Sequence, residues 1–203
     1  MRHRAKLLHL FGNAICCALI SEALTAKEAW FPFPAQATFE TGDTWIANGQ
    51  RFRLYGVQSC LRGTFFTNPQ GQKVDCGEAG IAMLAAMVKD LKPICSVTAR
   101  SAQMAYVVCV ADLTVQGRPV RLDLATSLIT AGYSFAALTP DAKPVHEPYV
   151  VAQYAAQQER RGFHAFPDTP DPNAILLRSL RQPPLNPGSP ATPEAPAPGP
   201  PPR

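Results

Sequence analysis

Hydrophobic and polar residues alternate along residues 42–57 in a pattern that predicts a β-hairpin. The dipeptide Asn48-Gly49 lies between two β-prone runs, Thr-Trp-Ile-Ala and Gln-Arg-Phe-Arg-Leu-Tyr. Asn-Gly is a favoured pair for a two-residue hairpin turn, because both residues tolerate a positive φ. We therefore predict strand, turn and strand over this segment. Residues 60–75 contain several turn-forming residues and are predicted to form a loop.

Three later segments show the periodicity of helices. In the first, apolar residues recur at three, four and seven positions along one face, and Pro93 ends the pattern. The three predicted helices span residues 77–91, 122–131 and 147–161. Two apolar runs, 94–98 and 104–113, predict a pair of antiparallel strands, and residues 116–119 predict a turn. This order of elements is typical of an α+β fold.

The first 26 residues have the layout of a secretory signal peptide. Cations at positions 2, 4 and 6 precede the apolar run Leu7–Ile20, and small residues follow it. This run has about 14 residues, fewer than the ~20 that a bilayer-spanning helix needs. We expect cleavage after Ala26, and an uncleaved membrane anchor is the alternative. Export to the periplasm or beyond the cell follows from cleavage, with no transmembrane segment left after processing.

The distribution of prolines predicts where the folded domain ends. Thirteen of the 21 prolines lie between Pro167 and Pro202, so we expect a disordered, proline-rich tail over residues 166–203. Residues 27–37 are interrupted by prolines and are predicted to be a lead-in segment or an edge strand. The predicted domain covers residues 38–165.

The charge balance does not indicate a strongly basic nucleic-acid-binding surface. The formal net charge of the chain is +4. Removal of residues 1–26 takes away Arg2, Arg4, Lys6 and Glu22, which leaves about +2.

Four cysteines remain after removal of the signal peptide, an even number in an exported chain. Four cysteines allow three connectivities. We favour Cys60–Cys76 and Cys95–Cys109, because the second pair would join the two apolar runs predicted as neighbouring antiparallel strands. Free buried thiols and a four-thiolate metal site are the alternatives, and no C-x-x-C spacing supports the metal site.

Short motifs in a particular order resemble the thermonuclease (staphylococcal-nuclease-like) family. The resemblance extends from about Thr38 to Ala165, and the order and spacing of the motifs carry it. The motifs are Gly42-Asp43-Thr44, Arg53-Leu54-Tyr55-Gly56-Val57, Cys76-Gly77-x-Ala79, Cys109, Leu128-x-x-Ala131-Gly132-Tyr133, Tyr149-x-x-x-Gln153-x-x-Ala156 and Arg161-Gly162-Phe163. The resemblance implies a five-stranded OB-type β-barrel with three helices.

The resemblance also implies a site for phosphodiester hydrolysis. In this family two carboxylates hold Ca²⁺, a glutamate activates water and two arginines neutralise the phosphorane. The first metal carboxylate corresponds to Asp43 and the first arginine to Arg53, and both are present.

Several other positions of the implied site depart from the family pattern. They are Thr41, Gln58, Ser59, Leu61 and, depending on the register, Gln103 or Met104. Gln58 replaces the second metal carboxylate, and Leu61 replaces the general base. Gln103 or Met104 replaces the second arginine. Thr41 replaces an aspartate found in many relatives, and Ser59 replaces a threonine.

These departures predict a protein that has lost nuclease chemistry. We expect a binding or accessory module of the envelope, acting in exopolysaccharide (succinoglycan-type) biosynthesis or in conjugative DNA transfer. Its expected partner is an envelope protein, a polysaccharide or a nucleic acid, and no cofactor is expected. The alternative is an active nuclease that binds Ca²⁺ and recruits other side chains, such as Arg62, Asp75, Glu78 or Arg100. An unrelated enzyme that uses His146 or His164 is a third possibility.

Overall fold

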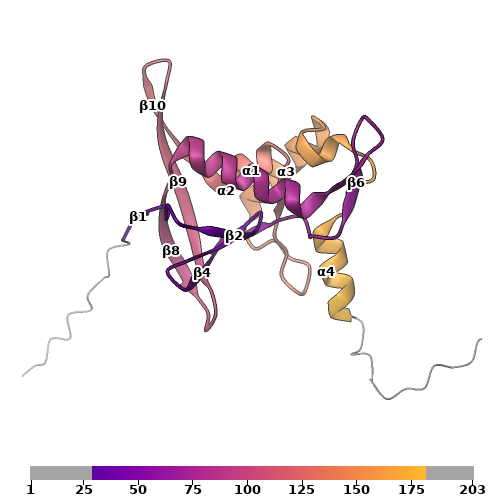
Figure 1. The fold of residues 1–203 in the computed structure, drawn as a ribbon, viewed down its shortest axis with the longest axis horizontal. Helices are drawn as coiled ribbons and strands as arrows, with labels where there is room; N and C mark the ends of the chain where they lie inside the picture. The colour runs from indigo at the N-terminus through magenta and orange to yellow at the C-terminus, as the bar shows by residue number, and fades with distance from the viewer. Residues whose placement is uncertain (1–28, 182–203) are drawn as a thin grey trace, which may run out of the picture.

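The chain forms a curled β-sheet with helices packed against it, as the computed structural model shows for residues 29–181 (Figure 1). The predicted signal peptide, residues 1–26, and the end of the predicted tail, residues 182–203, lie outside the described residues. The strands are β1 (Phe31–Pro32), β2 (Thr38–Thr41), β3 (Thr44–Ala47), β4 (Gln50–Leu54), β5 (Val57–Gln58), β6 (Phe65–Thr67), β7 (Lys73–Asp75), β8 (Ile94–Arg100), β9 (Ala105–Val115), β10 (Arg118–Asp123) and β11 (Phe135–Ala136). The helices are α1 (Cys76–Leu91), α2 (Leu124–Thr130), α3 (Glu147–Gln158), a 3₁₀ turn (Gly162–Ala165) and α4 (Pro172–Arg181).

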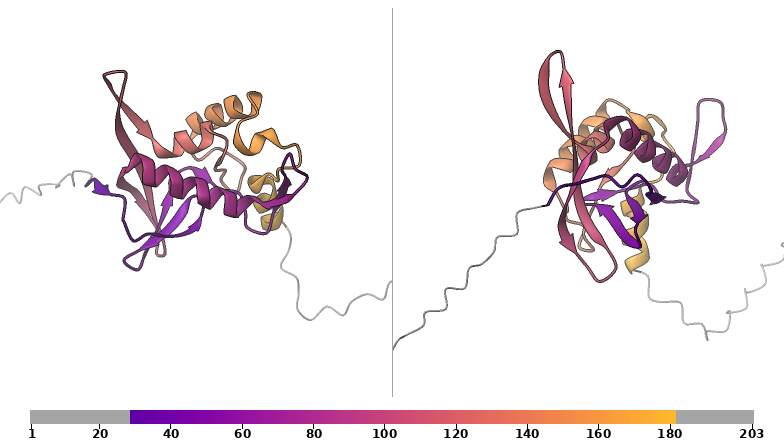
Figure 2. Two further views of the ribbon diagram at one scale, coloured as in Figure 1. Left: turned by 45° about the horizontal axis from the view of Figure 1, so that its top comes forward. Right: turned by 60° about the vertical axis from the view of Figure 1, so that its left-hand side comes forward.

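The main sheet has the strand order β1-β8-β9-β4-β3-β2, and β10 also pairs with β9. All neighbours are antiparallel except β4 and β9, which are parallel. The long strand β9 pairs with β4 through its first residues and with β10 through its remaining ones. The β9–β10 hairpin projects from the body of the protein, as two views show (Figures 1 and 2).

The predicted hairpin is confirmed. Ala47 pairs with Gln50, so Asn48 and Gly49 form the two-residue turn, with φ of 49° and 72°. Residues 31–32 form β1, an edge strand paired with β8, which confirms one of the two interpretations of the lead-in segment.

The core lies between the curled sheet and helices α1 and α2. Trp45, Leu84, Val107 and Leu128 are fully buried in it, together with the Cys95–Cys109 disulfide. A second, smaller cluster surrounds Cys60–Cys76 and contains the rings of Phe66, Phe135 and Phe163. The prediction of an α+β fold is confirmed, and the curled sheet is compatible with an OB-like architecture.

Two local predictions are wrong in extent. Residues 118–123 continue as β10 rather than belonging to a turn and a helix, and α2 starts only after Asp123, whose carboxylate accepts a hydrogen bond from the amide of Thr126. The segment 60–75, predicted as a loop, contains the short hairpin β6–β7. The main sheet therefore has seven strands rather than five, because the projecting β10 and the edge strand β1 extend it.

The predicted domain boundary at residue 165 is also wrong. Residues 172–181 form α4, a fourth helix, so the regular structure runs past the predicted start of the tail. The buried Asn173 side chain fixes the first turn of α4. Its amide nitrogen donates to the carbonyl of Ala136 at 2.9 Å, and its oxygen accepts from the amide of Leu138 at 3.3 Å. The high proline content of this region predicts disorder and therefore does not indicate a helix. Pro172 is nevertheless compatible with the helix, because it is at the first position, where a proline is tolerated.

Both disulfide pairings are confirmed. Cys60 bonds to Cys76 and Cys95 bonds to Cys109, and all four residues are buried. Cys95 and Cys109 are directly opposite each other on β8 and β9, as the prediction of neighbouring antiparallel strands required. Two disulfides are consistent with an exported protein. Within residues 29–181, every helix is too short or too polar to cross a membrane.

The two pairings can be checked directly by peptide mapping. Digestion without reduction should give two linked peptide pairs, 60 with 76 and 95 with 109. The sequence separations are 16 and 14 residues, so each bond should stabilise the fold by about 3 kcal/mol in the chain-entropy model. Four thiols that react with iodoacetamide in the native protein would contradict the pairing.

Candidate functional site

Asp43 is buried at the turn between β2 and β3, with only 2% of its surface exposed. Gly42 places it there, because a Cβ atom at residue 42 would come within 2.8 Å of the backbone of Gly80 on α1. The β2–β3 turn and helix α1 can therefore pack closely against each other, because each has a glycine, Gly42 and Gly80, at the point of contact. The Oδ1 atom of Asp43 accepts hydrogen bonds from the hydroxyls of Thr41 and Thr44.

Arg53 on β4 points at the same carboxylate. Its Nε and Nη2 atoms lie 3.0 and 2.9 Å from Oδ2 of Asp43. The position follows from the sheet register, which pairs Arg53 with Thr44, the residue after Asp43. The Arg53 side chain is 28% exposed, so one side of the guanidinium still faces outward.

Gln58 on β5 and the following Ser59 complete the cluster. Arg53 Nη2 donates to Gln58 Oε1 at 2.8 Å, while Gln58 Nε2 donates to the carbonyl of Ser59 at 2.8 Å. The backbone amide of Ser59 donates to Oδ2 of Asp43 at 3.2 Å. We call Thr41, Asp43, Thr44, Arg53, Gln58 and Ser59 the Asp43 cluster.

The acceptor capacity of the Asp43 carboxylate is filled by protein groups. An ionised carboxylate has about four lone-pair positions. Two hydroxyls, one backbone amide and the Arg53 guanidinium occupy them. The guanidinium supplies the positive charge that balances Asp43, and the amide oxygen of Gln58 is also engaged by Arg53. The cluster is therefore a closed ion pair rather than an open set of oxygen ligands.

The structure does not bring every predicted site residue into the cluster. Leu61 is half-buried and apolar. Gln103 is exposed in the connection between β8 and β9, where the amide of Ser101 donates to the carbonyl of Met104. Neither Gln103 nor Met104 donates a hydrogen bond to Asp43. Thr44 belongs to the cluster but was not assigned a role from sequence, although the motif Gly42-Asp43-Thr44 contained it.

Of the four side chains that an active nuclease would recruit, Arg62, Asp75 and Glu78 are engaged elsewhere. Arg62 pairs with Glu78 at 2.9 Å, in a largely exposed ion pair. Asp75 caps α1 by accepting from the amides of Glu78 and Gly63. Partial burial raises the pKa of Asp75, but these backbone hydrogen bonds outweigh it and hold the pKa below its ordinary value. Arg100 is exposed at the end of β8.

The two histidines lie in different surroundings. His146 precedes α3, and its ring contacts Tyr149 with a centroid distance of 4.4 Å. His164 lies against Phe135, and burial lowers the pKa of its imidazole. The two rings therefore do not share one site. Among residues 29–181, no group of three or more His, Cys, Asp or Glu side chains is arranged to hold a metal ion.

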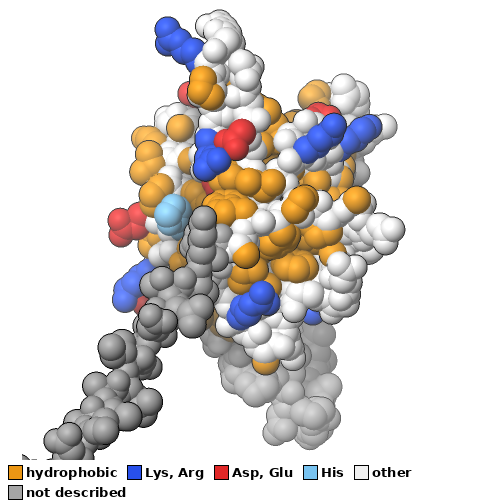
Figure 3. Space-filling model, turned by 90° about the vertical axis from the view of Figure 1, so that its left-hand side faces the viewer, with side chains coloured by type: hydrophobic (Ala, Val, Ile, Leu, Met, Phe, Trp, Pro, Cys, Tyr) orange, Lys and Arg blue, Asp and Glu red, His pale blue; other side chains and the backbone are white. Residues whose placement is uncertain are grey.

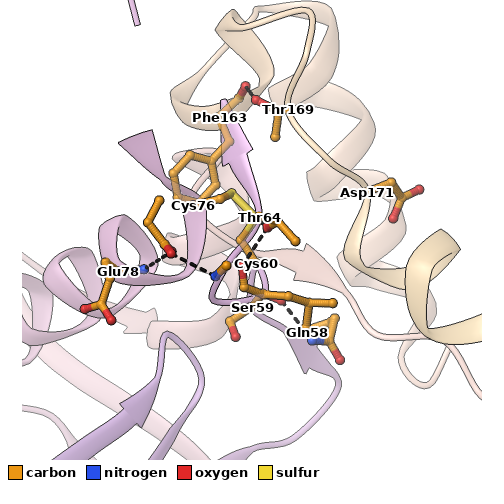
Figure 4. Close-up of a disulfide and its surroundings, with 12 residues drawn as sticks. Gln58, Ser59, Cys60, Thr64, Cys76, Glu78, Phe163, Thr169 and Asp171 are labelled. Atoms are coloured by element: carbon orange, nitrogen blue, oxygen red, sulfur yellow. Dashed lines mark hydrogen bonds between the residues drawn. A yellow bond between two sulfur atoms is a disulfide. The ribbon is translucent and has the colours of Figure 1, made fainter. Parts of the chain in front are cut away.

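The Cys60–Cys76 disulfide holds the strand that carries Gln58 and Ser59. Figure 4 shows Gln58 and Ser59 leading directly into Cys60, which is bonded to Cys76 at the start of α1. Phe163 belongs to the same buried cluster. The link fixes the segment after β5 to the helix, and this segment supplies the Ser59 amide to Asp43.

Two hollows lie on the surface near different parts of the fold. A cavity of about 520 Å³ borders Arg53 and Gln58 and extends to α4. A second hollow, of about 410 Å³, lies between the lead-in segment and α1. Figure 3 shows the face on the left of Figure 1, where hydrophobic side chains are broadly exposed and charges of both signs are scattered. This face therefore has no concentrated basic patch.

No protein-family model and no curated protein matches this chain. The function is therefore inferred from the residues of the Asp43 cluster and of the cavity beside it.

Proposed function

We propose that this chain is an exported, thermonuclease-like protein that no longer hydrolyses phosphodiesters and acts as a binding module of the cell envelope. The observation that carries the proposal is the closed Asp43–Arg53 pair. Asp43 and Arg53 match the family's functional positions, yet in this chain their charges are satisfied by each other and by protein hydrogen bonds.

The loss of chemistry follows from charge and ligand counts. Ca²⁺ takes six to eight oxygen ligands, and its affinity depends on the charge that they carry. Gln58 contributes no charge, and the Asp43 oxygens are already occupied. Leu61 cannot act as a general base, a change that typically costs about 10²- to 10⁴-fold in rate. Absence of the second arginine removes further stabilisation of the transition state.

A binding role is compatible with the fold and with export. OB-type sheets bind oligonucleotides and oligosaccharides on an open strand face, so binding can persist without catalysis. We place the role in exopolysaccharide production or in conjugative DNA transfer. The partner in such a role is an envelope protein, a polysaccharide or a nucleic acid.

A digestion assay tests the loss of chemistry. Single-stranded DNA and RNA incubated with the unmodified protein and Ca²⁺ should be cleaved no faster than with EDTA present. A variant that combines Gln58→Asp, Leu61→Glu and Gln103→Arg is the gain-of-function comparison, and Met104→Arg replaces the last change in a second variant. Calcium-dependent digestion by the unmodified protein, lost in a folded Asp43→Asn variant, would refute the proposal and establish an active nuclease.

A further inference from the structure

The hydrogen bonds that fix helix α4 to the rest of the domain lie in its first turn. Asn173 binds the backbone of Ala136 and Leu138, and Pro172 is fully buried. Asp171 caps the helix by accepting from the amides of Asn173 and Ala174. The leucines of the later turns are more exposed than the residues of the first turn: Leu176 is 37% exposed and Leu180 is 65% exposed. The domain thus anchors one end of α4 and leaves the other partly uncovered.

Three leucines of α4 form one wall of the 520 Å³ cavity. Leu176 and Leu177 fall on the same helical face as Leu180, because they precede it by four and three residues. The opposite wall contains residues of β4, β5, β8 and β9 and of the segment 137–145, including Leu54, Val57 and Val145, together with the tyrosines Tyr55 and Tyr106. A cavity of this volume with a mostly apolar lining has the size and character of a small-molecule site.

Arg53 is the one charged residue among those that line the cavity. Its Nε and Nη2 atoms bind Asp43, Gln58 and the carbonyl of Val57. Asp43 balances the charge of Arg53, but the Nη1 atom makes no hydrogen bond within residues 29–181, so two N–H donors of the guanidinium remain for a ligand. No carboxylate lines the cavity, and Arg178 and Arg181 in the last turn of α4 lie outside its lining.

We propose that this cavity binds an amphiphile with an aliphatic body and a single anionic head. The aliphatic body packs between the α4 leucines and the β4–β5 wall, and the head accepts hydrogen bonds from Arg53 Nη1. A nucleic acid strand fits poorly, because a single cation lines the cavity. A polysaccharide also fits poorly, because the mostly apolar lining leaves most of its hydroxyls without partners.

This inference goes beyond the proposed function by assigning a ligand class, and it rests on the proposed binding role. A lipid headgroup with its chain and a free fatty acid share the required chemistry. Its test is a binding measurement, whereas the loss of nuclease chemistry is tested by digestion. The failure of one can therefore be distinguished from the failure of the other.

The experiment is isothermal titration of the full chain with four probes: decanoate, decanol, decyltrimethylammonium and thymidine monophosphate. We expect decanoate to bind about tenfold or more tightly than decanol, because a charge-assisted hydrogen bond is lost in the alcohol. The cationic probe should bind more weakly still. Vesicles that contain an anionic phospholipid are a fifth probe. Binding to these vesicles in preference to decanoate would identify a membrane lipid, rather than a free fatty acid, as the ligand.

Variants on exposed helix positions separate the site from general hydrophobic binding. The double variant Leu176→Gln, Leu180→Gln should weaken decanoate binding about tenfold or more, since both side chains line the cavity. The matched control is Val151→Gln on α3, at a position 71% exposed and outside the cavity, and binding should be unchanged. Equal binding of decanoate and decanol, tighter binding of thymidine monophosphate, or no effect of the leucine variant would overturn the proposal.

Discussion

Replacement of Asp43 by alanine should lower the free energy of unfolding by about 3 kcal/mol. The substitution leaves the guanidinium of Arg53, the hydroxyl of Thr44 and the amide of Ser59 without their acceptor. Removal of one partner from a buried ion pair costs about 3–5 kcal/mol. Arg53 is partly exposed, so water can solvate it and the lower end of this range applies. For a domain of this size the melting temperature should fall by about 6–12 °C.

The pair Asp112–Arg121 on the β9–β10 hairpin provides the matched control. Its geometry is similar, with two hydrogen bonds of 2.7 and 2.9 Å, but both side chains are largely exposed. Asp112→Ala should therefore change stability far less than Asp43→Ala. Urea unfolding followed by circular dichroism measures both variants. Equal losses of unfolding free energy in the two variants would show that burial does not make the Asp43–Arg53 pair more stabilising than an exposed pair.

Substitution of Gly132 by alanine should also destabilise the protein strongly, by about 3 kcal/mol. Gly132 has φ of +80°, and a Cβ atom there would lie 2.1 Å from the carbonyl oxygen of Arg161. The positive φ costs an L-residue about 1–2 kcal/mol, and relief of the clash through backbone movement adds about 1–3 kcal/mol. The carbonyl of Gly132 also accepts from the amide of Phe163 at 2.9 Å, so the movement disturbs the cluster around Cys60–Cys76.

Gly117 separates the two contributions. It has nearly the same backbone conformation, with φ of +77°, but no atom lies within 4 Å of the position that a Cβ atom would occupy there. Gly117→Ala should therefore cost only the conformational part, about 1 kcal/mol. The difference between the two variants in the same urea experiment measures the close contact between the end of α2 and the segment at residue 161. No difference between them would contradict the contact.

Short-range signals predicted several elements of this fold well. Asn48-Gly49 specified its hairpin, because the turn requires positive φ at both residues and needs no distant contact. The apolar face of α1 and the stop at Pro93 specified the first helix. The strand pair that carries Cys95 and Cys109 followed from the two apolar runs, and with it one disulfide.

Other elements depend on contacts that the local sequence does not display. Residues 118–123 contain a proline and only two other apolar residues, Val120 and Leu122, and they form a strand because the second half of β9 offers a free edge. Helix α4 lies in a proline-rich region, and its placement depends on one buried asparagine that binds residues 35 and 37 positions earlier in the chain. Proline density alone indicated disorder there.

The sequence by itself determined which residues occupy the positions of the predicted site: Asp43, Arg53, the uncharged Gln58 and the apolar Leu61. The order of the motifs along the chain was enough to select these residues as members of one predicted site. Only the tertiary structure decided what the groups do to one another, because the same side chains can hold a cation or close on each other. Sheet register directs Arg53 at Asp43, the disulfide positions the Ser59 amide, and α4 adds an aliphatic wall beside the pair. The Arg53–Asp43 contact crosses one hairpin, whereas the Ser59 amide, the disulfide and α4 join separate elements, whose distance and direction are set by packing rather than by local sequence.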